Sequence, residues 1–193
     1  MELGDEVARH ELDRRAEQTL KRLHEDIAAL LPSTTAPPPA LEVGFAQQIG
    51  TEIRLVQRIG GDAPLTLERP MSIAPAYASL ASLIHQLYWS QEERAMYRAR
   101  HPLVDDGAAV WRDEAELDAY LRTIRGQACA ALDAPPGMQR VAAPIFGRGG
   151  TLTAVLEVVV HGPVSRLVQF RMQRCLREHA AALAPPTGAA SEA

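Results

Sequence analysis

A glycine-rich turn between two apolar stretches constrains the fold of this 193-residue chain more than any other feature. Residues 140–163 read RVAAPIFGRGGTLTAVLEVVVHGP, with the turn at residues 147–150. Glycine adopts positive φ without steric cost, so a tight reversal is favourable here and the stretch predicts an antiparallel hairpin. Gly162 and Pro163 end the second strand. Pro163 fits the first turn of a helix over about 164–183, because that position needs no backbone N–H.

The rest of the chain alternates between strand and helix patterns. The expected strands cover 41–47, 52–59, 64–68 and 127–132, and the expected helices cover 6–31, 74–88, 90–98 and 113–126. Strands from both ends of the domain must then share one antiparallel sheet, with helices on its faces. The sequence therefore predicts an α+β fold with a GAF- or PAS-like layout. Such sheets bind small ligands between one face and the crossing loops.

The predicted domain covers residues 41–184. We expect an amphipathic linker helix before it (1–32), then a proline-rich linker (33–40), and a flexible tail after it (185–193). The helix could lie on its own domain or pair with a second copy, and we favour pairing because the proline-rich linker would detach it. Both interpretations rest on an apolar seam with alternating four- and three-residue steps, formed by Ala16, Leu20, Leu23, Ile27 and Leu30.

Composition argues against several classes of function. The net charge of −4 gives no general attraction to phosphate, and the single lysine, Lys21, lies on a charged helix face. Neither a lysine-containing phosphate loop nor Schiff-base catalysis is therefore expected. No serine lies in a nucleophile elbow, so we expect no enzyme and no cofactor. No apolar run reaches membrane-spanning length and the charged N-terminus is unlike a signal peptide, which predicts a cytoplasmic protein.

Cysteine and histidine positions predict no metal site. Cys129 and Cys175 lie far apart and lack CxxC spacing, so we expect two buried free thiols. The six histidines are scattered, and none shows the spacing of metal ligands. We expect each histidine at the surface or in a capping role, and an exposed loop at residues 104–107.

Three stretches resemble the effector domain of IclR-type bacterial transcription regulators. Residues 70–82 look like the family's PLHATAAGKALLA helix start, and residues 117–126, LDAYLRTIRG, are similar to its next helix. Residues 141–163 look like its AAPVFD hairpin. The resemblance covers roughly 41–183 and matches the first helix to the family's linker helix. It implies a ligand-sensing domain that forms dimers or tetramers through helices and a sheet edge.

One departure from the family concerns DNA binding. Family members carry a winged helix-turn-helix domain ahead of the linker helix, whereas about thirty residues precede the proline-rich linker here. Those residues carry eight acidic and five basic side chains, and DNA readout normally needs a basic face. We therefore expect either an effector domain without a DNA-binding domain or a fragment of a longer regulator. Direct nucleic-acid binding would require a DNA-binding domain outside this chain.

Other departures concern the ligand pocket. The family's Gly-Lys pair becomes Tyr77 and Ala78, and its pocket serines on the last strand become Glu157 and Val159. Tyr77 can be a core residue or a stacking wall. A common aspartate of the family falls at Ala130. The ligand-binding residues implied by the resemblance are Met71, Tyr77, Ala78, Ala130, Arg140, Ala142, Glu157 and Val159.

Arg140 and Glu157 should face each other on the two hairpin strands. A buried arginine needs a partner, and Glu157 is the candidate on the neighbouring strand. The pair could be a structural ion pair that plugs an ancestral pocket. Alternatively, Arg140 could receive a ligand carboxylate while Glu157 orients it.

Two functions follow from these alternatives. In the first, the chain senses a small, acidic or aromatic metabolite, and binding changes the oligomer. In the second, it is a degenerate effector domain with a filled pocket, which pairs with a full-length regulator. A pocket in which a ligand measurably stabilises the domain favours the first function, and a stable Arg140–Glu157 pair in a dry, closed core favours the second.

Overall fold

The computed structural model describes residues 2–31, 39–60, 63–65, 70–73, 76–133 and 135–185. Most of the predicted linker and tail lies outside these ranges, as do residues 66–68 of the third predicted strand. The helices are α1 (Glu2–Leu30), α2 (Leu80–Tyr88), α3 (Gln91–Arg100), α4 (Leu103–Asp106), α5 (Glu114–Ile124) and α6 (Arg166–Leu183). The strands are β1 (Ala40–Ile49), β2 (Glu52–Gly60), β3 (Ala63–Leu65), β4 (Met71–Ser72), β5 (Ala130–Leu132), β6 (Met138–Phe146) and β7 (Leu152–His161).

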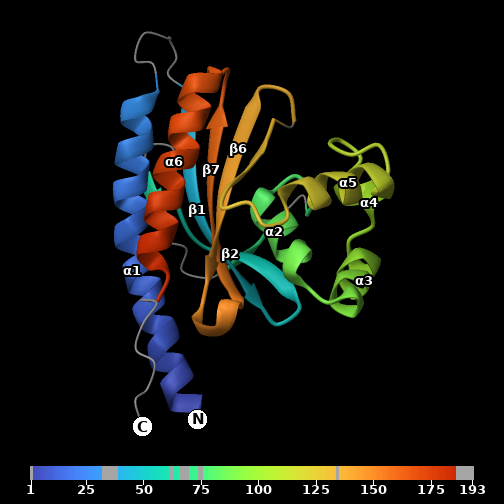
Figure 1. The fold of residues 1–193 in the computed structure, drawn as a ribbon, viewed down its shortest axis with the longest axis horizontal. Helices are drawn as coiled ribbons and strands as arrows, with labels where there is room; N and C mark the ends of the chain where they lie inside the picture. Colours follow the sequence, from blue (N-terminus) through green and yellow to red (C-terminus); the bar gives the residue numbers. More distant parts are fainter. Residues whose placement is uncertain are drawn as a thin grey trace.

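Within the described ranges, the seven strands form one antiparallel sheet, in the order β3-β2-β1-β7-β6-β5 with β4 also beside β2 (Figure 1). Strand β1 lies between β2 and β7, so Leu41 is opposite Val160. Strands from the two ends of the chain therefore share one sheet, and the predicted α+β class is confirmed.

The β6–β7 hairpin forms where the sequence predicts it. Its register runs from Met138 opposite His161 to Phe146 opposite Leu152. The turn contains Gly149 at φ 84°, a backbone conformation that favours glycine.

The start of the last helix differs from the prediction. Pro163 does not occupy the first turn, because α6 begins at Arg166. The N-cap is Ser165, whose hydroxyl accepts the Val168 N–H. Such a hydroxyl satisfies one of the free N–H groups of the first turn, which fixes the helix start three residues after the proline.

Helices α1 and α6 lie side by side on one face of the sheet (Figure 1). The α1 seam is buried against this domain rather than exposed for a second copy. In the structure the helix therefore lies on its own domain, and not on a second copy as we had favoured. The buried contacts join Ala16, Leu20, Leu23 and Ile27 of α1 to Met172 and Leu176 of α6 and to strand residues such as Val43 and Leu156.

Helices α2 to α5 belong to the opposite face (Figure 1). The helix predicted over 90–98 is present as α3, and Ser90 and Glu93 form a capping box at its start. The predicted helix over 74–88 starts later, at Leu80, because Ser79 is extended and its side chain caps the Ser82 N–H. The predicted loop at residues 104–107 instead contains most of the short helix α4, although Val104 is exposed.

Two predictions about single side chains also need correction. His85 is buried rather than at the surface, because it lies on the face of α2 that packs against the sheet. Cys129 and Cys175 are free thiols, as expected, but both are only half-buried. Among the described residues, no helix combines the length and the apolar character that crossing a bilayer requires.

Candidate functional site

A cavity of about 220 Å³ lies where the sheet faces the start of α2. It is lined from β1, β2, β4, β6 and β7, with Ser79 at the helix end. Its walls combine apolar side chains, such as Leu55 and Ile73, with charged ones. The four charged residues that line it are Glu42, Arg58, Arg140 and Glu157.

The predicted pair of Arg140 and Glu157 is present in the cavity wall. Glu157 is opposite Ala142, so Arg140 lies diagonally across the hairpin from it. Arg140 Nη1 donates to Glu157 Oε1 at 3.2 Å, and the two side chains are only 15% and 9% exposed. This low exposure makes the pair more costly to break than a surface ion pair, because the remaining charge would stay buried.

Glu157 also caps helix α2 from the sheet. Its Oε1 accepts the Leu80 N–H at 2.9 Å, and its Oε2 accepts the Ser79 hydroxyl at 2.7 Å and the Ala81 N–H at 3.3 Å. The first N–H groups of a helix lack partners within the helix and carry partial positive charge, which suits an anion. In this protein its own carboxylate occupies that anion position.

Arg140 keeps unused donor capacity. Its Nη2 contacts the Met138 sulfur at 3.0 Å, and its Nε has no hydrogen-bond partner within the described part of the chain. A buried donor without a partner costs free energy. A small shift of the guanidinium toward an acceptor in the cavity would recover that free energy.

A second pair lies on the other side of the cavity. Arg58 Nη1 is 3.4 Å from Glu42 Oε2, and the His161 ring nitrogen Nε2 is 3.3 Å from Glu42 Oε1. Both partners of the arginine pair are about one third exposed, so this pair contributes less than the buried one. With two arginines and two glutamates, the cavity wall has balanced charge.

The structure brings together four of the eight predicted ligand-binding residues at this cavity, namely Met71, Arg140, Glu157 and Val159. The other four lie in the core. Ala130 is opposite Ala142 in the β5–β6 pairing, and both alanines are buried together with Ala78.

Tyr77 is a core residue rather than a wall of this cavity. Its hydroxyl donates to the His101 carbonyl at 2.6 Å, and its ring meets Tyr97 edge-on with centroids 6.5 Å apart. Burial raises the pKa of Tyr77 to about 12. The tyrosine therefore serves the packing of the helical layer.

Sequence reasoning missed the β1–β2 side of the cavity. Glu42 and Gly44 are two residues apart and so face the same side of β1, which was a usable signal. The pairing of Gly44 with Arg58 was not predictable, because a bulge between Phe45 and Ala46 shifts the register. Gly44 keeps this wall open, since an added Cβ would lie 2.8 Å from Leu55 Cδ1.

No protein-family model and no curated protein sequence matches this chain. Solved structures do match, and among them is the IclR protein of Thermotoga maritima, with a TM-score of 0.67 and 16% identity over 94% of this chain and 71% of that one. The C-terminal domain of the Escherichia coli transcriptional regulator KdgR matches with a TM-score of 0.62 and 14% identity, over 89% of this chain and 95% of that domain.

The chain has the IclR effector-domain fold. Pseudomonas aeruginosa HmgR shares it at 21% identity, with a TM-score of 0.62 over 94% of this chain and 71% of that one. These matches confirm the resemblance predicted from the sequence at the level of the fold. The chain spans about two thirds of the length of the longer proteins it matches, between 66% and 71% of each.

Proposed function

We propose that this IclR-type effector domain senses a small organic molecule, which binds in the cavity beside Arg140 and Glu157. One observation carries the proposal: the Arg140–Glu157 pair borders a cavity instead of filling a closed core. The fold supports the same function, because solved transcriptional regulators share it. On this basis the domain would serve a bacterial cytoplasmic regulator whose DNA-binding part lies outside the residues that form this fold.

The size and lining of the cavity restrict the ligand. A volume of about 220 Å³ is below the roughly 300–1,000 Å³ of pockets for drug-sized ligands, which favours a compact molecule. An acidic ligand would place its carboxylate on Arg140, whose planar guanidinium suits bidentate contacts. An aromatic or aliphatic part would lie against Leu55, Ile73 and Val159.

Ligand binding would act on the contact between the sheet and α2. A ligand carboxylate that took Arg140 from Glu157 would leave Glu157 bound to α2 alone. The resulting change in α2 or in the hairpin would bias the oligomer, provided that the ligand binds one arrangement more tightly than the other. The domain would form a dimer or a tetramer whose assembly responds to the ligand in this way.

The test is thermal unfolding of the purified chain against a panel of small carboxylic acids and aromatic metabolites. A ligand at one hundred times its Kd stabilises by about 2.7 kcal/mol, which raises Tm by roughly 5–10 °C for a chain of this size. We expect Arg140→Ala to abolish this rise. Arg112→Ala is the matched control, because the Arg112 side chain is 81% exposed and does not line the cavity.

Two outcomes would count against ligand sensing at this cavity. A rise in Tm that persists in Arg140→Ala would show that the ligand binds at another site. A panel without any rise would instead favour the interaction protein that pairs with a full-length regulator.

A further inference from the structure

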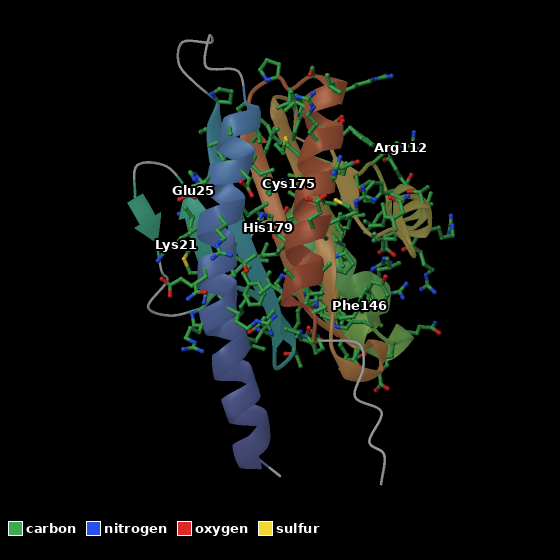
Figure 2. All side chains as sticks on the ribbon, turned by 60° about the vertical axis from the view of Figure 1, so that its left-hand side comes forward. Lys21, Glu25, Arg112, Phe146, Cys175 and His179 are labelled. Atoms are coloured by element: carbon green, nitrogen blue, oxygen red, sulfur yellow. The ribbon has the colours of Figure 1, made fainter. Side chains whose placement is uncertain are left out.

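Three potential metal ligands meet at the interface of α1 and α6. They are Asp26 on α1, and Cys175 and His179 on α6. Figure 2 shows Cys175 and His179 on the part of α6 that runs beside α1. His179 Nε2 lies 2.8 Å from Asp26 Oδ2, and one ligand atom from each of the three residues lies within 4.8 Å of the others.

The helix geometry explains how the two α6 ligands come together. Cys175 and His179 are four residues apart, so they project from the same face of α6. That face meets α1, because the neighbouring residues Leu176 and Ala180 are buried in the same layer. Asp26 precedes Ile27, a buried residue of the α1 seam, which places its carboxylate at the edge of the helix contact.

The chemistry of this donor set favours zinc. Thiolate, imidazole and carboxylate are the side chains that bind Zn²⁺ in proteins, and the thiolate selects against Mg²⁺ and Ca²⁺. Tetrahedral zinc with bond lengths of about 2.0–2.3 Å needs ligand atoms roughly 3.5 Å apart. The contact of 2.8 Å between His179 Nε2 and Asp26 Oδ2 must therefore lengthen by about 0.7 Å, and no pair of ligand atoms has to approach by more than about 1.3 Å.

The exposure of the three residues is compatible with metal entry. The Asp26 side chain is 57% exposed, whereas the His179 side chain is 17% exposed and lies in the interface. Cys175 is half-buried. Three protein ligands that open toward solvent leave a fourth position for water.

We propose that Asp26, Cys175 and His179 bind one Zn²⁺ ion, which clamps the linker helix α1 to the effector domain. A hydrogen bond between His179 and Asp26 explains why these two side chains meet, but it does not explain why the Cys175 thiol lies beside them. The site lies on the α1–α6 face, whereas the cavity faces α2. The metal clamp is therefore independent of the proposed ligand sensing.

Cobalt is the first probe, because Co²⁺ replaces Zn²⁺ in tetrahedral sites and its bond to a thiolate gives an ultraviolet charge-transfer band. We expect the reduced full chain to bind one Co²⁺ with this band, and Zn²⁺ to displace it. Cys175→Ser should abolish the band. Cys129→Ser is the matched control and should keep it, because Cys129 is a half-buried free thiol outside the cluster.

The other two ligands test the clamp itself. We expect His179→Ala to weaken Zn²⁺ binding at least one-hundredfold and Asp26→Asn at least tenfold. Zn²⁺, but not Mg²⁺, should raise the Tm of the unmodified chain and not that of Cys175→Ser. A chain without the cobalt band, or a band that survives Cys175→Ser, would overturn the metal site. Unchanged binding in Asp26→Asn would overturn the clamp, because α6 alone would then hold the ion.

Discussion

Glu157 on strand β7 accepts a hydrogen bond of 2.7 Å from the hydroxyl of Ser79, the residue that caps helix α2. The same carboxylate holds Arg140 of β6 and two backbone N–H groups of the helix. One acidic side chain thus joins the hairpin to the helical layer, at the wall of the cavity. Removal of this carboxylate should therefore lower the stability of the fold, whether or not a ligand is bound.

We expect Glu157→Gln to lower the free energy of unfolding by about 3 kcal/mol, because Arg140 would remain buried without its charged partner. Urea denaturation followed by circular dichroism measures the loss. Glu178→Gln is the control and should change stability by less than about 0.5 kcal/mol, since Glu178 and Arg174 form an exposed pair. Equal effects of the two substitutions would contradict the assigned role of Glu157.

His85 should make stability depend on acid pH. Burial lowers the pKa of His85 to about 4 from 6.5, so the folded state keeps the ring neutral where the unfolded chain takes up a proton. Its stabilising contribution is therefore complete above pH 6.5 and is lost as the pH falls toward 4, a change of roughly 3 kcal/mol. Unfolding midpoints at pH 7.5, 5.5 and 4.5 measure this slope.

The control for that slope is the substitution His85→Leu. Leucine removes the titration, and it also removes the hydrogen bond between His85 and the Ala46 backbone, so the slopes are compared and not the absolute stabilities. The variant should lose stability less steeply between pH 6.5 and 4.5. An unchanged slope would assign the acid sensitivity to other groups.

The α1 seam should contribute to the stability of a single chain. We expect Leu23→Ala to lower the free energy of unfolding by about 2–4 kcal/mol, because Leu23 is fully buried in the α1–α6 layer. Leu167→Ala on α6 is the control and should have little effect, since Leu167 is 60% exposed. The measurement is chemical denaturation at several protein concentrations. A loss that appears only at concentrations where the chain self-associates would instead place the seam between two copies.

The hairpin turn gives a prediction about backbone strain. Gly149→Ala should destabilise by about 1 kcal/mol, because φ at this residue is +84° and a Cβ disfavours that conformation. Nothing lies within 4 Å of the added Cβ, so crowding does not contribute. Thr151→Ala just beyond the turn is the control, with ordinary φ of −77°. A thermal shift assay is sufficient to compare the two.

Local signals in the sequence predicted most of the elements. The glycine turn predicted the β6–β7 hairpin, and the helix predicted over 90–98 corresponds to α3. The start of α6 lies later than the predicted residue 164, because the cap at Ser165, and not Pro163, fixes where the helix begins. Each of these features depends on a few neighbouring residues, which is why sequence reasoning reaches them.

The candidate sites depended on contacts between distant segments. Arg140 and Glu157 were found because one hairpin joins their strands, whereas Arg58 reaches the cavity through a register that a bulge shifts. The Asp26–Cys175–His179 cluster was missed for the same reason. Only the packing of α1 on α6 shows that an aspartate from the first helix meets the last one.

The central place of β1 has a consequence for how the chain folds. Its neighbours are β2 and β7, so Val43 meets Val158 only after almost the whole chain has been synthesised. Contacts of such large sequence separation slow folding, because a long loop must close before they form. Until β7 arrives, β1 exposes an unpaired apolar edge of the kind that promotes aggregation. A nascent or truncated chain that stops before residue 152 should therefore depend on chaperones more than the complete domain does.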